Sequence, residues 1–242
     1  SEIAMLSDRF LLMPGLRYDD VKATTAPDML YFAGNPGVGE PTDFADSATS
    51  LKLGALYRLD NNSAVFANYS EGFRAPPYDD VNLGFSNVMG GYKTVSAPNL
   101  TSETSEGIEI GLRTRSEIWS ASIAVFQTDF DDFIAAAGEG HCSRQYQVTG
   151  CRDPIDGFLV FQSENLESVT IEGVEIKAEL DLAGVGLENM DLRFAAAYAS
   201  GEETNTNNPI NTIQPLSGVL GLSYGNPAGD WSASTVLTLV SS

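Results

Sequence analysis

Apolar and polar residues alternate along much of the chain, and this pattern constrains the fold more than any other feature. In the clearest segment, Ile108, Ile110 and Leu112 are separated by Glu, Gly and Arg. The same alternation recurs in residues 174–180 and near residues 231–239. A period of two places successive side chains on opposite faces of a β-strand. The sequence therefore predicts an all-β protein whose strands have one apolar face and one mostly polar face.

The connections between these strands alternate between two kinds. Clusters of Asp, Asn, Gly and Ser predict short turns, whereas longer segments rich in Gly, Pro, Asn and Asp predict extended loops. The short turns are at residues 7–9, 60–63, 115–117, 183–189 and 226–230, and the long loops are at residues 25–48, 73–102, 137–157 and 202–214.

Two architectures explain strands with one apolar face: a soluble sandwich, and a membrane barrel whose apolar face contacts lipid. Strict alternation of short and long connections favours an antiparallel up-and-down transmembrane β-barrel, with short periplasmic turns and long extracellular loops. We count about ten strands of roughly ten residues or more, a length that suits a tilted spanning strand.

Aromatic residues near the strand ends agree with a barrel, because such residues form girdles at both membrane interfaces. Ordinary enrichment of aromatic residues in strands explains some of the same positions. The candidate girdle residues are Tyr18, Tyr57, Tyr69, Phe126, Tyr198, Tyr224 and Trp231.

Composition excludes several other classes of protein. The formal net charge of −20 excludes a nucleic-acid binder with a general basic surface. Hydrophobic residues make up 43% of the chain, yet no apolar run approaches the roughly 18 residues that a membrane-spanning helix needs. The first residues lack the basic and apolar regions of a signal peptide.

One segment resembles a known family. Residues 68–77 read Asn-Tyr-Ser-Glu-Gly-Phe-Arg-Ala-Pro-Pro, and resemble the strand-to-loop motif of TonB-dependent receptors. A Pro-Asn-Leu element and the strand at residues 103–113 follow in the order seen in that family. Residues 14–19 and 173–175 resemble an earlier and a later strand. The motif residues are Phe73, Arg74, Ala75, Pro76, Pro98, Asn99 and Leu100.

The resemblance implies a function and a larger architecture. TonB-dependent receptors are bacterial outer-membrane proteins with a barrel of about 22 strands and an N-terminal plug domain. Residues 1–242 would then supply part of the barrel, without the plug and the closing C-terminal strands. The family imports scarce nutrients with energy that the TonB complex delivers through the plug. Outer-membrane lipid and lipopolysaccharide would surround the barrel.

The sequence looks most similar to the branch that binds haem, haemoglobin, transferrin and lactoferrin. The expected transported ligand is therefore haem, a haem protein from a host or the environment, or a ferric siderophore, with no covalently bound cofactor. The motif residues flank the outer loop 77–97, where haem receptors of this kind generally place a histidine. This loop contains Tyr78 and Tyr92 but no histidine, and the only histidine is His141. Tyrosine can ligate haem iron in other proteins, so we take Tyr78, Tyr92 and His141 as candidate ligand contacts. The resemblance adds the motif residues that flank the loop to the candidate ligand-binding residues: Phe73, Arg74, Ala75, Pro76, Pro98, Asn99 and Leu100.

The two cysteines, Cys142 and Cys151, lie close together in one polar segment. This spacing favours a disulfide in an extracytoplasmic loop, and a metal site is the alternative. The pairs Asp79–Asp80 and Asp131–Asp132 are acidic, and a solvated loop explains them better than a calcium site.

Two other functions are open to a barrel of this kind. A passive porin or structural barrel would share the strand pattern but not the Gly-Phe-Arg-Ala-Pro turn. A membrane-embedded enzyme would need a nucleophile beside a base, or paired carboxylates in a cleft. With one histidine and no such arrangement visible, we predict that the protein is not an enzyme.

Overall fold

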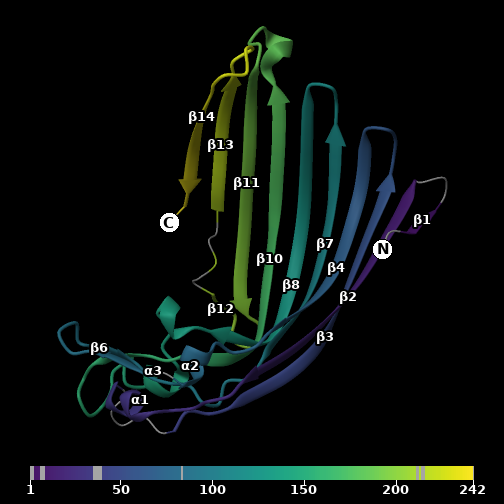
Figure 1. The fold of residues 1–242 in the computed structure, drawn as a ribbon. Helices are drawn as coiled ribbons and strands as arrows, with labels where there is room; N and C mark the ends of the chain where they lie inside the picture. The colour runs from purple at the N-terminus through teal and green to yellow at the C-terminus, as the bar shows by residue number, and fades with distance from the viewer. Residues whose placement is uncertain are drawn as a thin grey trace.

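Ten strands pair side by side to form one curved antiparallel wall (Figure 1). The computed structural model describes residues 3–5, 9–34, 40–82, 84–210, 213 and 216–241. The strands follow the order β1-β2-β3-β4-β7-β8-β10-β11-β13-β14. Their bounds are β1 Ile3–Met5, β2 Phe10–Ala23, β3 Phe44–Arg58, β4 Ser63–Arg74, β7 Glu103–Arg115, β8 Trp119–Ala135, β10 Glu164–Asp181, β11 Met190–Glu203, β13 Leu216–Gly225 and β14 Ser232–Val240.

The predicted alternation of short and long connections is confirmed. Residues 59–62, 116–118 and 226–231 make short links at one end of the wall, together with residues 182–189, which contain the 3₁₀ turn η2 (Leu182–Val185). Four long connections lie at the opposite end (Figure 1). They span residues 24–43, 75–102, 136–163 and 204–215.

Small elements occupy the long connections. The helices are α1 Met29–Gly34, α2 Tyr78–Asn82 and α3 Arg144–Gln147, with a 3₁₀ turn η1 at Ala137–Glu139. Strands β5 (Phe85–Asn87), β6 (Tyr92–Thr94) and β9 (Leu159–Phe161) form a separate small sheet, and β12 (Asn208–Pro209) pairs with β11.

Within the described residues, no helix has the length and apolar character needed to cross a membrane.

The register of the wall sorts side chains by face. Ile110 pairs with Val125, and Val125 pairs with Val174, so these side chains share one face. This face stays exposed along its length: Ile110 is 52% exposed and Val125 is 53% exposed. No second sheet covers it in the described part of the chain. An exposed aliphatic band on a single sheet is expected for a surface that contacts lipid.

The opposite face carries polar and charged side chains together with a few aromatic ones. We call this polar side of the wall the inner face. Phe126 pairs with Glu109 and Gly173, so it lies on the inner face. A Cβ atom on Gly173 would come within 2.7 Å of the Phe126 ring, which explains why glycine stands there. The assignment of Phe126 to a lipid-facing girdle is therefore wrong, because the register turns it inward.

Strand ends differ from the sequence prediction by a few residues. Strand β3 begins at Phe44, inside the predicted loop 25–48, because residues 44–48 pair with β2. Strand β4 continues to Arg74, so Phe73 and Arg74 are paired strand residues opposite Thr104 and Glu103. The predicted turn at residues 7–9 falls mostly outside the described residues.

A charge on the exposed aliphatic face should destabilise the barrel. Ile176 lies on that face and is 40% exposed, so Ile176→Arg in the membrane-embedded protein should cost about 2–4 kcal/mol near the bilayer midplane. Urea unfolding in phospholipid vesicles measures the cost. The control is Ser217→Arg, at a similar depth on the inner face, where the arginine stays in water. Equal losses for the two variants would contradict the assignment of the faces.

Candidate functional site

The long connections gather at one end of the wall and form a cluster of loops (Figure 1). Two of them, residues 75–102 and 136–163, are joined by the small sheet, because β6 pairs in parallel with β9. These loops contain the residues that the sequence singled out for ligand binding, except Phe73 and Arg74, which end β4. Their contacts show which of those residues hold the loops in place and which are accessible.

The Phe-Arg-Ala-Pro segment is anchored by a buried carboxylate. Arg74 Nη1 lies 3.5 Å from Glu103 Oε2. The same oxygen accepts a hydrogen bond of 2.8 Å from the backbone N–H of Ile134. Glu103 is 6% exposed and Ile134 is 1% exposed. The motif arginine therefore pairs with a carboxylate that also holds the outer end of β8.

The Pro-Asn-Leu segment packs onto the same region. Leu100 is buried with Val81, Ala97 and Ile134 in a small apolar cluster. Thr101, the next residue, is held by the side chain of Asn165, which accepts a hydrogen bond from the Thr101 N–H and donates one to the Thr101 carbonyl. Leu100 and Asn165 thus fix the return of the loop to the wall.

Helix α2 ties a third loop to the cluster through buried Asn82. Its Oδ1 accepts from the Thr42 N–H at 2.6 Å, and its Nδ2 donates to the Thr42 carbonyl at 3.2 Å. The Tyr31 hydroxyl donates to the Asn82 carbonyl at 2.9 Å. The connection between β2 and β3 is therefore bonded to the connection between β4 and β7.

The two candidate tyrosines have different surroundings. Tyr92 lies in β6 between Phe85 and Phe161, with ring centroids 6.2 Å away on each side. Tyr78 begins α2 and is 43% exposed. Tyr92 is thus part of the packing of the small sheet, while the Tyr78 ring is open to a ligand.

Lys93 joins the small sheet to the loop before β9. Its Nζ donates to Asp153 at 2.6 Å and to Asp156 at 2.9 Å. The hydrogen bond to Asp153 is the main reason that the pKa of Lys93 is raised. The same lysine lowers the pKa of both carboxyl groups, again chiefly through its hydrogen bonds.

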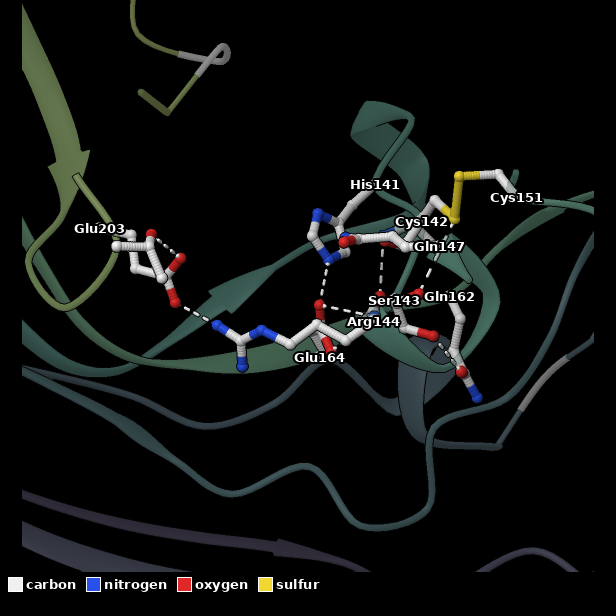
Figure 2. A network of polar contacts seen from close by, with 12 residues as sticks. His141, Cys142, Ser143, Arg144, Gln147, Cys151, Gln162, Glu164 and Glu203 are labelled. Carbon is white, nitrogen blue, oxygen red and sulfur yellow. Dashed lines mark hydrogen bonds and ion pairs between the residues drawn. A yellow bond between two sulfur atoms is a disulfide. The ribbon is translucent and has the colours of Figure 1, made fainter. Parts of the chain in front are cut away.

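The predicted disulfide between Cys142 and Cys151 is present, with Cα atoms 5.9 Å apart. It closes a short loop that contains α3 (Figure 2). The Gln147 side chain donates to the Cys142 carbonyl at 2.8 Å inside that loop. The loop is therefore held by one covalent bond and by internal hydrogen bonds.

Polar contacts bind the disulfide loop to the wall (Figure 2). His141 Nε2 lies 2.8 Å from Glu164 Oε1 at the start of β10. Glu164 also accepts from the Arg144 N–H, and the Arg144 guanidinium pairs with Glu203 at the end of β11. His141 is thus held in a network of polar contacts that reaches β10 and β11.

Two hollows lie beside this network. One, of about 490 Å³, is lined by His141, the disulfide and Arg144, with an apolar side that includes Phe133 and Ile210. The other, of about 340 Å³, is lined by Pro98, Asn99 and Leu100 together with Glu164 and Asn165. Glu164 lines both hollows, so its carboxylate lies between the hollow beside His141 and the hollow beside the Pro-Asn-Leu segment. The described residues contain no group of three or more His, Cys, Asp or Glu side chains that could hold a metal ion.

The structure brings some predicted site residues together and separates others. Tyr78 and Tyr92 line neither of the two hollows. Sequence reasoning missed Glu103, Glu164 and Glu203 because a single acidic residue in a strand carries no signal for its partner. Whether the candidate residues contact a ligand stays a prediction.

Comparison with known proteins identifies the family. An open β-wall with an aliphatic outer band and structured loops at one end is the wall of an outer-membrane barrel. The family profile "TonB dependent receptor-like, beta-barrel" matches residues 2–242. The chain therefore belongs to the TonB-dependent receptors of the bacterial outer membrane, a family of receptors and transporters and not of enzymes.

Several relatives agree with the branch that the sequence resembled. "Hemoglobin-haptoglobin utilization protein B" of Neisseria meningitidis is 27% identical, over 96% of this chain and 30% of its own. "Probable hemoglobin and hemoglobin-haptoglobin-binding protein 4" of Haemophilus influenzae is 31% identical, over 79% of this chain and 19% of its own. "Lactoferrin-binding protein A" of N. meningitidis is 26% identical, over 96% and 25%. The chain thus spans less than a third of the length of these relatives.

Solved structures share the fold. "Copper transporter OprC" superposes with a TM-score of 0.68 at 20% identity, over 97% of this chain and 33% of that one. The ferric enterobactin receptor of Pseudomonas aeruginosa gives a TM-score of 0.60 at 17% identity, over 98% and 31%. The antiparallel barrel wall is therefore confirmed as the fold.

Removing the Glu103 carboxylate should loosen the motif loop. Glu103→Ala leaves the buried N–H of Ile134 without its acceptor, and should cost about 1–3 kcal/mol of unfolding free energy. Glu103→Gln retains an acceptor and loses only the pairing with half-exposed Arg74, which should cost less than about 1 kcal/mol. Urea unfolding of the receptor in vesicles compares the two. Equal costs would show that the bond to Ile134 contributes little.

The ion pairs of Lys93 should give the small sheet a pH dependence. The pKa values of Asp153 and Asp156 lie below their ordinary value of 3.8 in the folded protein, so both carboxylates stabilise the fold at pH values above 3.8. This stabilisation is lost as the pH falls through their lowered pKa values. The raised pKa of Lys93 adds stability below 10.5 that is lost as the pH rises through its folded value.

Hydrogen-exchange protection of the Leu159 amide, which bonds to the Gly91 carbonyl, reports on this sheet. The protection factor should be steady near neutral pH and should fall in acid below about pH 4. Lys93→Met is the control and should flatten the profile. An identical acid loss in that variant would assign the effect to other groups.

Proposed function

We propose that the intact protein is an energy-coupled receptor that imports an iron-bearing ligand through the outer membrane. The observation that carries the proposal is the similarity to "Hemoglobin-haptoglobin utilization protein B" over 96% of the chain, loops included. The lactoferrin-binding relative matches over the same share of the chain. A haem protein or another iron-carrying protein is therefore our first candidate ligand, and free haem or a ferric siderophore is the alternative.

The architecture of the whole protein forms part of the proposal. We propose a closed barrel of about 22 strands with an N-terminal plug, to which residues 1–242 contribute wall and outer loops. Two features support a larger barrel: the wall ends in strands β1 and β14, which lie far apart (Figure 1), and unpaired edges are not tolerated in hydrocarbon. The TonB complex would act through the plug, and lipid and lipopolysaccharide would cover the aliphatic face.

We further propose two roles for the motif residues. Phe73 and Arg74 belong to the paired end of β4, and Arg74 pairs with buried Glu103. The first role, for these two residues and for Ala75 and Pro76, which follow them, is to position the loop without contacting the ligand. Exposed Pro98 and Asn99, with Leu100 beneath them, form one border of the hollow at Glu164.

Tyr78, Tyr92 and His141 remain the candidates for ligand contact. Tyr78 is the most open of the three, and the His141 side chain is 23% exposed beside the larger hollow. We propose that Tyr78 and His141 contact the ligand directly, while Tyr92 shapes the small sheet that supports it.

Uptake by the full-length receptor tests the proposal. Outer membranes with the receptor should accumulate labelled haem from haemoglobin, or a labelled siderophore, only when the energy-coupling partner is active. The control is the same strain with the coupler deleted. Uptake that continues without the coupler would replace this proposal with a passive porin.

The contact residues are tested separately by binding to intact cells. Tyr78→Ala and His141→Ala should each weaken ligand binding roughly 5- to 30-fold, the loss typical of a significant interface residue. Tyr224→Ala is the control, because Tyr224 contacts Trp231 beside the short connection 226–231, at the end of the wall opposite the loops. Unchanged binding in both loop variants would remove these residues from the site.

A further inference from the structure

The apolar outer face of the wall is bounded by charge at the end that carries the long loops. On β7, Ile108 is followed on the same face by Glu106, which pairs with Asp129 on β8. On β10, Val174 is followed on the same face by Glu172. A charged side chain is destabilising in hydrocarbon, and more so the deeper it lies. Carboxylates therefore mark the limit of the lipid-facing surface at the loop end.

The apolar band that remains is shorter than an outer-membrane bilayer requires. On β8 it runs from Trp119 to Val125. This segment covers about 20 Å along the strand at ~3.4 Å per residue, or about 15 Å in height at a tilt of ~40°. The apolar band of outer-membrane barrels is about 25 Å tall. Because the loop end is charged, the missing height comes either from the short connections or from a thinner bilayer.

Two neighbouring short connections carry exposed apolar side chains. Ile118, between β7 and β8, is 45% exposed. Val185 and Leu187, between β10 and β11, are 71% and 50% exposed. Turn residues are usually polar, as in the Asp-Asn-Asn sequence of the connection between β3 and β4. We call Ile118, Val185 and Leu187 the apolar tip.

Backbone contacts within and between these two connections hold the apolar tip in place. The Ile118 carbonyl accepts a hydrogen bond of 2.8 Å from the Asp181 N–H. The Asp181 side chain accepts another, also of 2.8 Å, from the Ala183 N–H in η2. Gly186 has a φ of 85°, and its N–H donates to the Ala183 carbonyl. These polar groups are bonded inside the turn, as a segment in contact with lipid requires.

The apolar tip is continuous with the lipid-facing surface. Trp119 pairs with Leu180, and Leu180 pairs with Leu192, so the three side chains form the last row of the outer face at this end. Tryptophan is enriched at the level of the lipid headgroups. Ile118 comes directly before Trp119, and η2 begins two residues after Leu180. The apolar surface therefore extends past the strands and into the turns.

The charges beside the apolar tip indicate which lipid it suits. The connections at residues 116–118 and 182–189 contain Glu117 and Glu188 but neither lysine nor arginine. Anionic headgroups attract basic segments, so they would be repelled by these two carboxylates. A zwitterionic headgroup has no net charge and offers an ammonium group to a carboxylate. The surroundings of the tip are therefore complementary to a zwitterionic lipid surface.

We propose that the apolar tip is a membrane anchor that inserts into the headgroup layer beside the short connections, in the periplasmic leaflet. Its partner is a zwitterionic lipid surface. The anchor supplies the apolar height that the strands of this part of the wall lack. The proposal goes beyond the proposed function, since it depends on the membrane and not on the ligand that the protein imports.

Bilayers of different thickness test the anchor. The intact protein is reconstituted in vesicles of dilauroyl or of dioleoyl phosphatidylcholine, which are both zwitterionic and differ in acyl-chain length. The test variant is Val185→Gln/Leu187→Gln. The control is Val88→Gln/Met89→Gln, which changes two exposed apolar residues at the loop end of the wall. Urea unfolding is measured for the parent and both variants.

The test variant should unfold at a lower urea concentration than the parent in the thick dioleoyl bilayer. In the thin dilauroyl bilayer the two should nearly coincide, because the apolar band of the strands alone spans more of a thin hydrocarbon layer. The control should match the parent in both lipids.

A fluorophore reports the position of the apolar tip directly. Val185→Cys and Val88→Cys are each labelled with the same dye in dioleoyl vesicles, and the chain's own two cysteines are bonded to each other. A lipid with a nitroxide near its headgroup should quench the dye at position 185 several-fold more strongly than the dye at position 88. Aqueous iodide should show the opposite order.

Two results would overturn the anchor. One is equal iodide quenching at positions 185 and 88, which would place the tip in water and leave the bilayer to thin around the wall. The other is a test variant that matches the parent in the thick bilayer, or that loses the same stability in both bilayers. Neither measurement involves uptake, so a failure of the import proposal is distinguishable from a failure of the anchor.

Discussion

Backbone pairing between neighbouring strands is the constraint on which the rest of this structure depends. Within hydrocarbon no water can satisfy a free N–H or C=O group, so each strand must bond to a neighbour along its length. Strands β10 and β11 pair without interruption from Val169 to Asp181, and β7 pairs with β8 in the same manner from Thr104 to Arg115. Once this pairing is complete, the register is fixed, and the register decides which side chains meet lipid.

The face of every side chain follows from that register. A shift of the strand register by one residue would turn the aliphatic side chains toward the lumen and the charged side chains toward lipid. The wall has an exposed aliphatic side and a polar side, so the usual signs of a globular core are absent from its middle. Burial is concentrated instead at the loop end, where Ile134, Val160 and Val169 are almost fully enclosed. Packing therefore stabilises the loops, and hydrogen bonding with lipid contact stabilises the wall.

Much of the wall was predictable from the sequence, because period-two alternation and turn residues are local signals. The strand at residues 103–115, the order of connections and the Cys142–Cys151 disulfide all follow from neighbouring residues. The orientation of Phe126 was not predictable from the sequence, since it depends on pairing across strands. Nor was the parallel pairing of β6 with β9, which joins Tyr92 to Leu159 across 67 positions. The partners of Glu103, Glu164 and Glu203 were hidden for the same reason.

The loop contacts change how the family motif should be understood. A motif at the mouth of a receptor suggests direct ligand contact, yet Arg74 pairs with a buried carboxylate and Leu100 lies in an apolar cluster. The loops are bonded to one another through Asn82, Lys93 and the network around Glu164, so they do not behave as independent arms. Loops held in one arrangement lose less conformational entropy when a ligand binds, which increases affinity without adding a contact. Arg74 and Leu100 therefore fix the geometry of the loops, and that geometry determines how the exposed loop side chains are presented.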